Sequence, residues 1–229
     1  MSAEKLNSAA SFAKVLTKLV PYIRTVAVTG SVAYGSAEKW DDIDLFIITE
    51  HKRMWISAFL TLILVRINKL LSLRPPHLYP FCLSYVHAEE EFSRESQRNR
   101  SNPLFARELL KAKPIAGVKE YRRILEANRW VSEFYSEPYY EKLKGLESNL
   151  NGDTPLHGVK LGNSSIFLDW FDGVAYTVLS RYLRLRAYLT NLKLKSEGKD
   201  LRVFEPIITS ASCVYTSNFY RWLRSLWGQ

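Results

Sequence analysis

The stretch that most limits the possible folds is Asp42-Ile-Asp-Leu-Phe-Ile-Ile-Thr49. Its apolar, β-branched residues are typical of a strand buried in a sheet. Two carboxylates, Asp42 and Asp44, nevertheless stand where the strand begins, and residues at i and i+2 of a strand point to the same face. Buried carboxylates are costly unless they are paired or bind a metal. The pattern therefore predicts a divalent-cation site, of the Mg²⁺ or Mn²⁺ type, that shares its ion with substrate phosphates.

A glycine–serine turn precedes this strand in the sequence. Residues 24–28 read as a strand, and Gly30 and Ser31 follow it almost at once. A glycine lets backbone N–H groups approach a phosphate closely, and the serine hydroxyl adds a further donor. The turn is therefore predicted to bind phosphate beside the carboxylate pair.

The rest of the chain predicts an α/β fold with a small mixed β-sheet, followed by a C-terminal helical region. We expect an α/β domain over residues 1–100 and a helical domain over residues 101–229. Helical spacing and breakers predict helices over residues 8–20, 52–71, 103–111, 118–134, 166–194 and 204–227, and strands over 24–28, 43–48 and 79–87.

One segment tests whether the chain enters a membrane. Residues 54–71 are strongly apolar, but Arg66, Asn68 and Lys69 cut the run short of the roughly 20 residues that a span needs. A buried core helix is the favoured interpretation. The N-terminus has no apolar core of a signal peptide, and the two cysteines have no disulfide or zinc spacing, so we expect a cytoplasmic protein.

The positive charge lies in the second half of the chain. Residues 1–92 hold 10 Lys or Arg and 9 Asp or Glu, whereas residues 93–229 hold 22 and 14, so that the net charges are +1 and +8. Such an excess favours RNA or another polyanion as a partner. Arg181 and Arg184 share one helix face and are candidate nucleic-acid contacts, although a solvated basic face explains the same spacing.

A strand that ends in Gly-Ser, then about a dozen residues, then Asp-x-Asp and an apolar strand resembles the polymerase-β-type nucleotidyltransferase superfamily. The resemblance covers residues 22–50. It implies metal-dependent transfer of a nucleoside monophosphate from an NTP, such as ATP, to a hydroxyl, with release of pyrophosphate. It further implies that Gly30 and Ser31 hold phosphates, and that Asp42 and Asp44 are the catalytic residues that bind Mg²⁺ or Mn²⁺.

The chain departs from that family at a third carboxylate, which the superfamily usually places on a later strand. The matching strand reads Phe81-Cys-Leu-Ser-Tyr-Val86 and holds no acid. Glu108 and Glu89 are the possible substitutes, and both could instead be surface residues.

Three hypotheses follow. The first is a nucleotidyltransferase whose acceptor is unidentified, with RNA mildly favoured. The second is a catalytically impaired module of the same fold that binds nucleotide or nucleic acid, for example as a toxin–antitoxin component. A third, weaker hypothesis is a structural nucleic-acid-binding protein. The sequence leaves the oligomeric state open.

Overall fold

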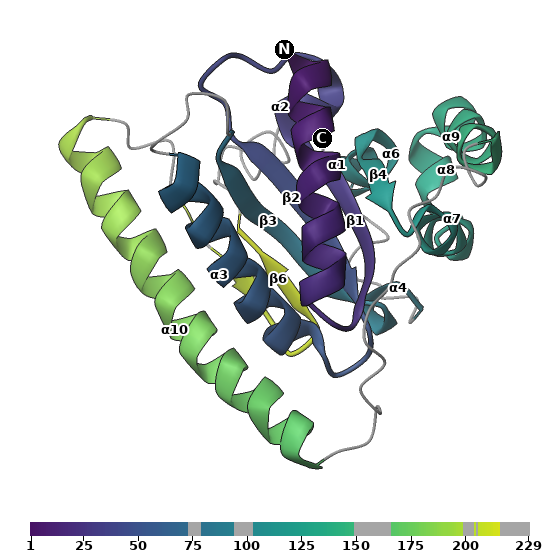
Figure 1. The fold of residues 1–229 in the computed structure, drawn as a ribbon. Helices are drawn as coiled ribbons and strands as arrows, with labels where there is room; N and C mark the ends of the chain where they lie inside the picture. The colour runs from purple at the N-terminus through teal and green to yellow at the C-terminus, as the bar shows by residue number, and fades with distance from the viewer. Residues whose placement is uncertain (73–78, 94–102, 149–165, 199–203, 205, 216–229) are drawn as a thin grey trace.

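The computed structural model describes residues 1–72, 79–93, 103–148, 166–198, 204 and 206–215 (Figure 1). The described chain forms one six-stranded sheet with helices around it. The strands are β1 (Ile23–Thr29), β2 (Ile43–Thr49), β3 (Phe81–Ala88), β4 (Lys113–Ala116), β5 (Ile207–Ile208) and β6 (Ser212–Val214). The helices are α1 (Ser2–Leu19), α2 (Gly30–Tyr34), α3 (Met54–Ser72), α4 (Glu90–Ser93), α6 (Pro103–Lys111), α7 (Val118–Ala127), α8 (Val131–Phe134), α9 (Ser136–Ser148) and α10 (Ile166–Ser196).

The strand order is β4-β1-β2-β3-β6-β5, and the sheet is mixed. β1 and β2 are antiparallel, whereas β2 and β3 are parallel, with α3 between them in the chain. A parallel pair needs such a crossover, since its second strand must start at the same edge as the first. The starts of β2 and β3 therefore lie side by side, next to the end of β1.

A hydrophobic core lies on each face of the sheet. On one face, α1, α3 and α10 pack over alternate strand residues such as Val28, Leu45 and Ile47. On the other face, α6, α7, α8 and α9 pack over the intervening residues, among them Phe46 and Ile48. Figure 1 shows α1, α3 and α10 together on one side and α6 to α9 grouped apart from them. Because both faces are covered, the central strands are largely apolar.

Helix α3 is the segment that raised the membrane question. It is the one helix of the described residues that is long and apolar enough to cross a membrane, and a third of its 18-residue window is buried. Trp55, Ala58 and Val65 belong to the core, while Ile67 and Leu70 on the outer side are exposed. A core helix of a soluble protein passes the same test of length and composition.

The predicted α/β class is confirmed, and so are the three predicted strands. The predicted helix over residues 118–134 is interrupted, because the Asn128 amide donates to the backbone oxygen of Ile124 at 2.8 Å and ends α7 there. The predicted helix over residues 204–227 is wrong where the structure describes it: β5 and β6 form a hairpin that covers the edge of β3.

The second half of the chain is therefore not purely helical in the described part. Strands β4, β5 and β6 all join the sheet of the first half. β4 was not predicted, because it is short and contains Pro114, a residue that strands tolerate mainly at a sheet edge. The predicted boundary between residues 100 and 101 lies outside the described residues.

Candidate functional site

Asp44 occupies a crowded position at the middle of the sheet. It lies opposite Thr29, the last residue of β1, and opposite Cys82 of β3. The Ser84 hydroxyl donates to its carboxylate at 2.5 Å. Asp42 stands just before β2 and is exposed. Both predicted carboxylates thus lie where β1 ends and where β2 and β3 begin.

The glycine of the predicted phosphate turn is required by this arrangement. Gly30 has φ +66°, in the left-handed region that side chains disfavour, and a Cβ there would lie 2.3 Å from Oδ2 of Asp44. No other residue type fits without displacing the carboxylate. Ser31 is in the first turn of α2, and its hydroxyl hydrogen-bonds to the side chain of Asp41.

A buried lysine fixes the loop that carries Asp42. Lys5 of α1 is fully buried, and its ammonium donates to the backbone oxygens of Glu38 and Asp41, the latter at 2.6 Å. The Asp41 carboxylate in turn accepts the backbone N–H of Glu38 at 2.9 Å. Sequence reasoning missed Lys5, because a lysine in the first turn of an N-terminal helix is usually solvated.

The two proposed substitutes for the third acid lie in different places. Glu108 of α6 is buried, lines the same cavity as the carboxylate pair, and accepts hydrogen bonds from the hydroxyls of Thr29 and Tyr34. The alternative that Glu108 is a surface residue is therefore wrong. Glu89 follows the far end of β3, where its carboxylate lies 3.4 Å from Arg123. The structure does not bring Glu89 to the carboxylate pair.

Cys82 lies on β3, the strand on which the superfamily usually places its third carboxylate. The Sγ atom of Cys82 and one carboxylate oxygen each of Asp42 and Asp44 all lie within 4.8 Å of one another. This proximity follows from the parallel register of β2 and β3, which places Cys82 beside Asp44. The sequence shows that a cysteine is present on this strand, but it does not show the strand register that places Cys82 beside Asp44.

Helix α10 and the C-terminal hairpin close the cavity, which has a volume of about 300 Å³. Arg186 and Thr190 of α10 line it, together with Phe204 and Tyr215, whose rings stack at 5.6 Å between centroids. The guanidinium of Arg186 lies over the Tyr215 ring at 5.0 Å. None of these four residues was predicted from the sequence.

The two arginines singled out by helical spacing are elsewhere on α10. Arg181 and Arg184 are exposed and do not line the cavity. At about 100° per residue, Arg186 lies on the opposite side of the helix from Arg184. The inward face of α10 is set by packing against α3 and the core, which the sequence alone does not reveal.

Comparison with known proteins agrees with this geometry. A family model described as "Nucleotidyltransferase domain" matches residues 10–119. The chain contains a nucleotidyltransferase domain. The match runs from α1 to the start of α7 and includes Gly30, Asp42, Asp44, Cys82 and Glu108. No curated protein and no solved structure matches the chain significantly.

The electrostatics of the nucleotidyltransferase domain single out Asp44. The pKa of its carboxyl is raised to about 7, chiefly by burial and to a smaller extent by the neighbouring carboxylates of Asp42, Glu108 and Asp41, against the lowering effect of the Ser84 hydrogen bond. The pKa of the Cys82 thiol is raised to about 12, chiefly by burial and also by the charges of Asp44 and Asp42. The site therefore concentrates negative charge that only a cation or protons can neutralise.

The donor set fits a divalent cation. Two carboxylates and a sulfur lie close enough together to reach one ion, and Gly30 has no side chain that would displace the Asp44 carboxylate from this position. Oxygen ligands of this type suit Mg²⁺ or Mn²⁺. Asp42 and Asp44 would hold the ion, which when bound would supply charge stabilisation of phosphate oxygens.

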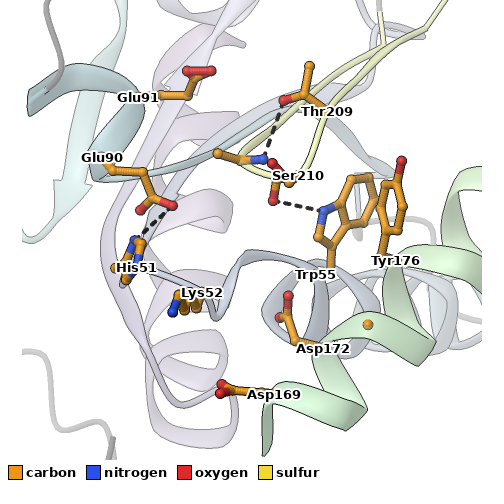
Figure 2. A pocket seen from close by; sticks show the side chains of 12 residues that line it. His51, Lys52, Trp55, Glu90, Glu91, Asp169, Asp172, Tyr176, Thr209 and Ser210 are labelled. Atoms are coloured by element: carbon orange, nitrogen blue, oxygen red, sulfur yellow. Dashed lines mark hydrogen bonds and ion pairs between the residues drawn. The ribbon is translucent and has the colours of Figure 1, made fainter.

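A second, larger cavity of about 610 Å³ lies near the far ends of β2 and β3 (Figure 2). Three of its four acidic residues are engaged in contacts within the fold. Asp169 pairs with Arg53 at 2.6 Å, Asp172 accepts the backbone N–H of Ile56 at 2.9 Å, and His51 lies 2.9 Å from Glu90. The first two contacts connect the starts of α3 and α10, and the third connects the segment before α3 to α4, so a structural role accounts for them.

Proposed function

We propose that the chain transfers a nucleoside monophosphate from an NTP to a hydroxyl acceptor in the cavity at the start of β2. The observation that carries the proposal is the close approach of Gly30 to Asp44, which leaves no space for a side chain on the phosphate turn. Such a turn lets backbone N–H groups contact phosphate beside the carboxylates. The family match supports the same general reaction.

The roles follow from where each residue lies. Gly30 and Ser31 would bind the phosphates, and Asp42 and Asp44 would hold a divalent metal, Mg²⁺ or Mn²⁺. Arg186 would offset the negative charge of the triphosphate, and the aromatic pair Phe204 and Tyr215 offers a stacking surface for a base. ATP is the first NTP to test.

Glu108 is the proposed third acid. It is buried at the cavity wall, and the hydroxyls of Thr29 and Tyr34 fix its orientation. A carboxylate held in this way would accept the proton of the acceptor hydroxyl as a general base. RNA remains the favoured acceptor, because the exposed Arg181 and Arg184 extend a basic face along α10. We place the reaction in the cytoplasm.

A catalytically impaired binding module is the second candidate. The observation that favours it is that a thiol, Cys82, and not a carboxylate lies beside Asp42 and Asp44 on β3. In that case the chain binds NTP and metal without turnover. Product formation, and not binding, separates the two candidates.

The test is incubation of the full chain with each α-labelled NTP and Mg²⁺ or Mn²⁺, in the presence of total RNA or of the chain alone. We expect metal-dependent label on an acceptor, and loss of this label when Asp42→Asn and Asp44→Asn are combined. Glu137→Gln combined with Glu141→Gln, which removes two exposed acids of α9, is the charge-matched control and should keep the label. Equal labelling by the double variant would refute the site, whereas retained NTP binding without label would favour the binding module.

A further inference from the structure

The third corner of the metal site is a sulfur atom. Asp42, Asp44 and Cys82 each place one ligand atom within 4.8 Å of the other two. Ligand atoms bind a divalent transition metal at about 2.0–2.3 Å, so two ligands of one ion lie at most roughly 4.6 Å apart. Asp42 is exposed, so its side chain is free to turn toward the other two ligand atoms.

The fold holds this sulfur in place. Cys82 is paired in register with Asp44 across two parallel strands, and Ser84, two residues later on β3, donates to the Asp44 carboxylate. Residues at i and i+2 of a strand share a face, so Cys82 and Ser84 both flank Asp44. Cys213, the other cysteine, is on β6 in the hydrophobic core and belongs to no such group among the described residues.

The donor chemistry separates one class of cation from another. Carboxylates alone suit Mg²⁺, which dehydrates reluctantly and prefers oxygen. A thiolate is a soft ligand that favours transition metals, and affinity for a mixed site of this kind rises along the series from Mn²⁺ to Co²⁺ and beyond. One sulfur in place of a carboxylate should therefore shift the preference away from Mg²⁺.

We propose that Cys82 is the third metal ligand of this site, and that the chain binds a sulfur-accepting divalent transition metal, of the Co²⁺ and Zn²⁺ class, in preference to Mg²⁺. The inference rests on the proposed function and names the ion of the same site. On binding, the thiol proton is released to solvent and an Sγ–metal bond takes its place, with no change of oxidation state.

Co²⁺ is the probe, because sulfur ligation gives it a near-ultraviolet charge-transfer band that oxygen ligation does not. The full-length wild-type chain is titrated with Co²⁺, with and without ATP, and Mg²⁺ is then added as competitor. We expect the band in the wild type, its loss in Cys82→Ser, and its retention in the matched control Cys213→Ser. Co²⁺ affinity should fall at least about tenfold in Cys82→Ser, the effect seen even for groups that only support a metal ligand.

Two further measurements keep the result interpretable. In the wild-type chain, Co²⁺ should protect Cys82 from alkylation, as mass spectrometry reads out without any variant, whereas Cys213 is buried and should resist alkylation with or without the ion. Cys82→Asp restores a third carboxylate and should bind Mg²⁺ more tightly than the wild type does, without the band.

The outcomes distinguish this inference from the proposed function. If the wild type binds Co²⁺ with no band and no protection of Cys82, Asp42 and Asp44 hold metal by oxygen alone; the inference is then overturned while the proposed function stands. If no divalent cation binds at all, both fail. If Mg²⁺ displaces Co²⁺ at equal concentration, the claimed preference is refuted even where the band is present.

Discussion

Replacement of Asp44 by asparagine should stabilise the metal-free protein, although it removes a central residue of the site. Burial raises the pKa of this carboxyl from 3.8 to about 7. At about 1.36 kcal/mol per pH unit, the ionised group at pH 8 costs the folded state roughly 4 kcal/mol. The Ser84 hydrogen bond to the charged carboxylate already lowers this pKa, so its loss in the variant is included in that figure. We therefore expect Asp44→Asn to raise the free energy of unfolding by about 2–4 kcal/mol at pH 8.

The sign of the effect sets its pH dependence. The folded state binds the Asp44 proton more tightly than the unfolded state, so the wild type loses stability as pH rises from about 4 to about 7. The asparagine variant lacks this loss. The difference between the two proteins should therefore be close to zero at pH 4, grow up to pH 7, and stay constant above it.

Urea unfolding of both proteins at several pH values, without metal, measures this difference. A divalent cation at 100 times its dissociation constant should then stabilise the wild type by about 2.7 kcal/mol and leave the variant unchanged. Asp42→Asn is the matched control: Asp42 is exposed, so its replacement should weaken metal binding with a much smaller gain in stability. An Asp44→Asn protein that is less stable than the wild type at pH 8, or equally altered at pH 4 and pH 8, would refute the reasoning.

Three other predictions test the remaining parts of the structure. Glu108→Gln should lower turnover by about 10²–10⁴-fold while NTP binding persists, if this residue is the general base, and a filter-binding assay beside the labelling assay separates the two effects. Arg181→Ala with Arg184→Ala should reduce the salt slope of RNA affinity by up to about two units, with NTP binding unchanged; an unaltered slope, or RNA bound no better than a neutral polymer, would favour a small-molecule or protein acceptor. Trp55→Ala, which removes a fully buried side chain of α3, should cost about 3–5 kcal/mol in urea unfolding, whereas membrane association of the wild type that survives a high-salt wash would contradict the core interpretation.

The local half of the site could be predicted from sequence, because its residues are close together in the chain. Strand β1, the glycine turn and the start of β2 lie within 21 residues, and the period of two along a strand places Asp42 and Asp44 on one face without any tertiary information. The structure adds the reason for the glycine, which is the 2.3 Å approach of its missing Cβ to Asp44. That contact joins the start of α2 to β2, so no pattern within either element reveals it.

The distant half of the site depends on register and on packing. Cys82 lies beside Asp44 only because β2 and β3 pair in parallel with this offset, and a slip of one residue would turn Cys82 to the other face. The contacts of α10 with α3 and the core fix which side of the helix faces inward. Arg186 lies at the cavity as a result, and the opposite side of α10 faces solvent. Helical spacing alone grouped Arg181 with Arg184 correctly but could not say which side of α10 faces the sheet.

A tertiary contact, and not local sequence, makes the C-terminal segment a hairpin instead of the predicted helix. Residues 207–214 carry apolar and small side chains that fit either a helix or a strand. The edge of β3 has backbone groups that need hydrogen-bond partners, and pairing with it favours the strand. The backbone N–H of Tyr215 bonds to the oxygen of Ser84 at 2.9 Å, directly beside Asp44. The strand that closes the sheet therefore also brings the Tyr215 ring to the cavity, and an isolated helix over these residues would leave the carboxylate pair without its aromatic wall.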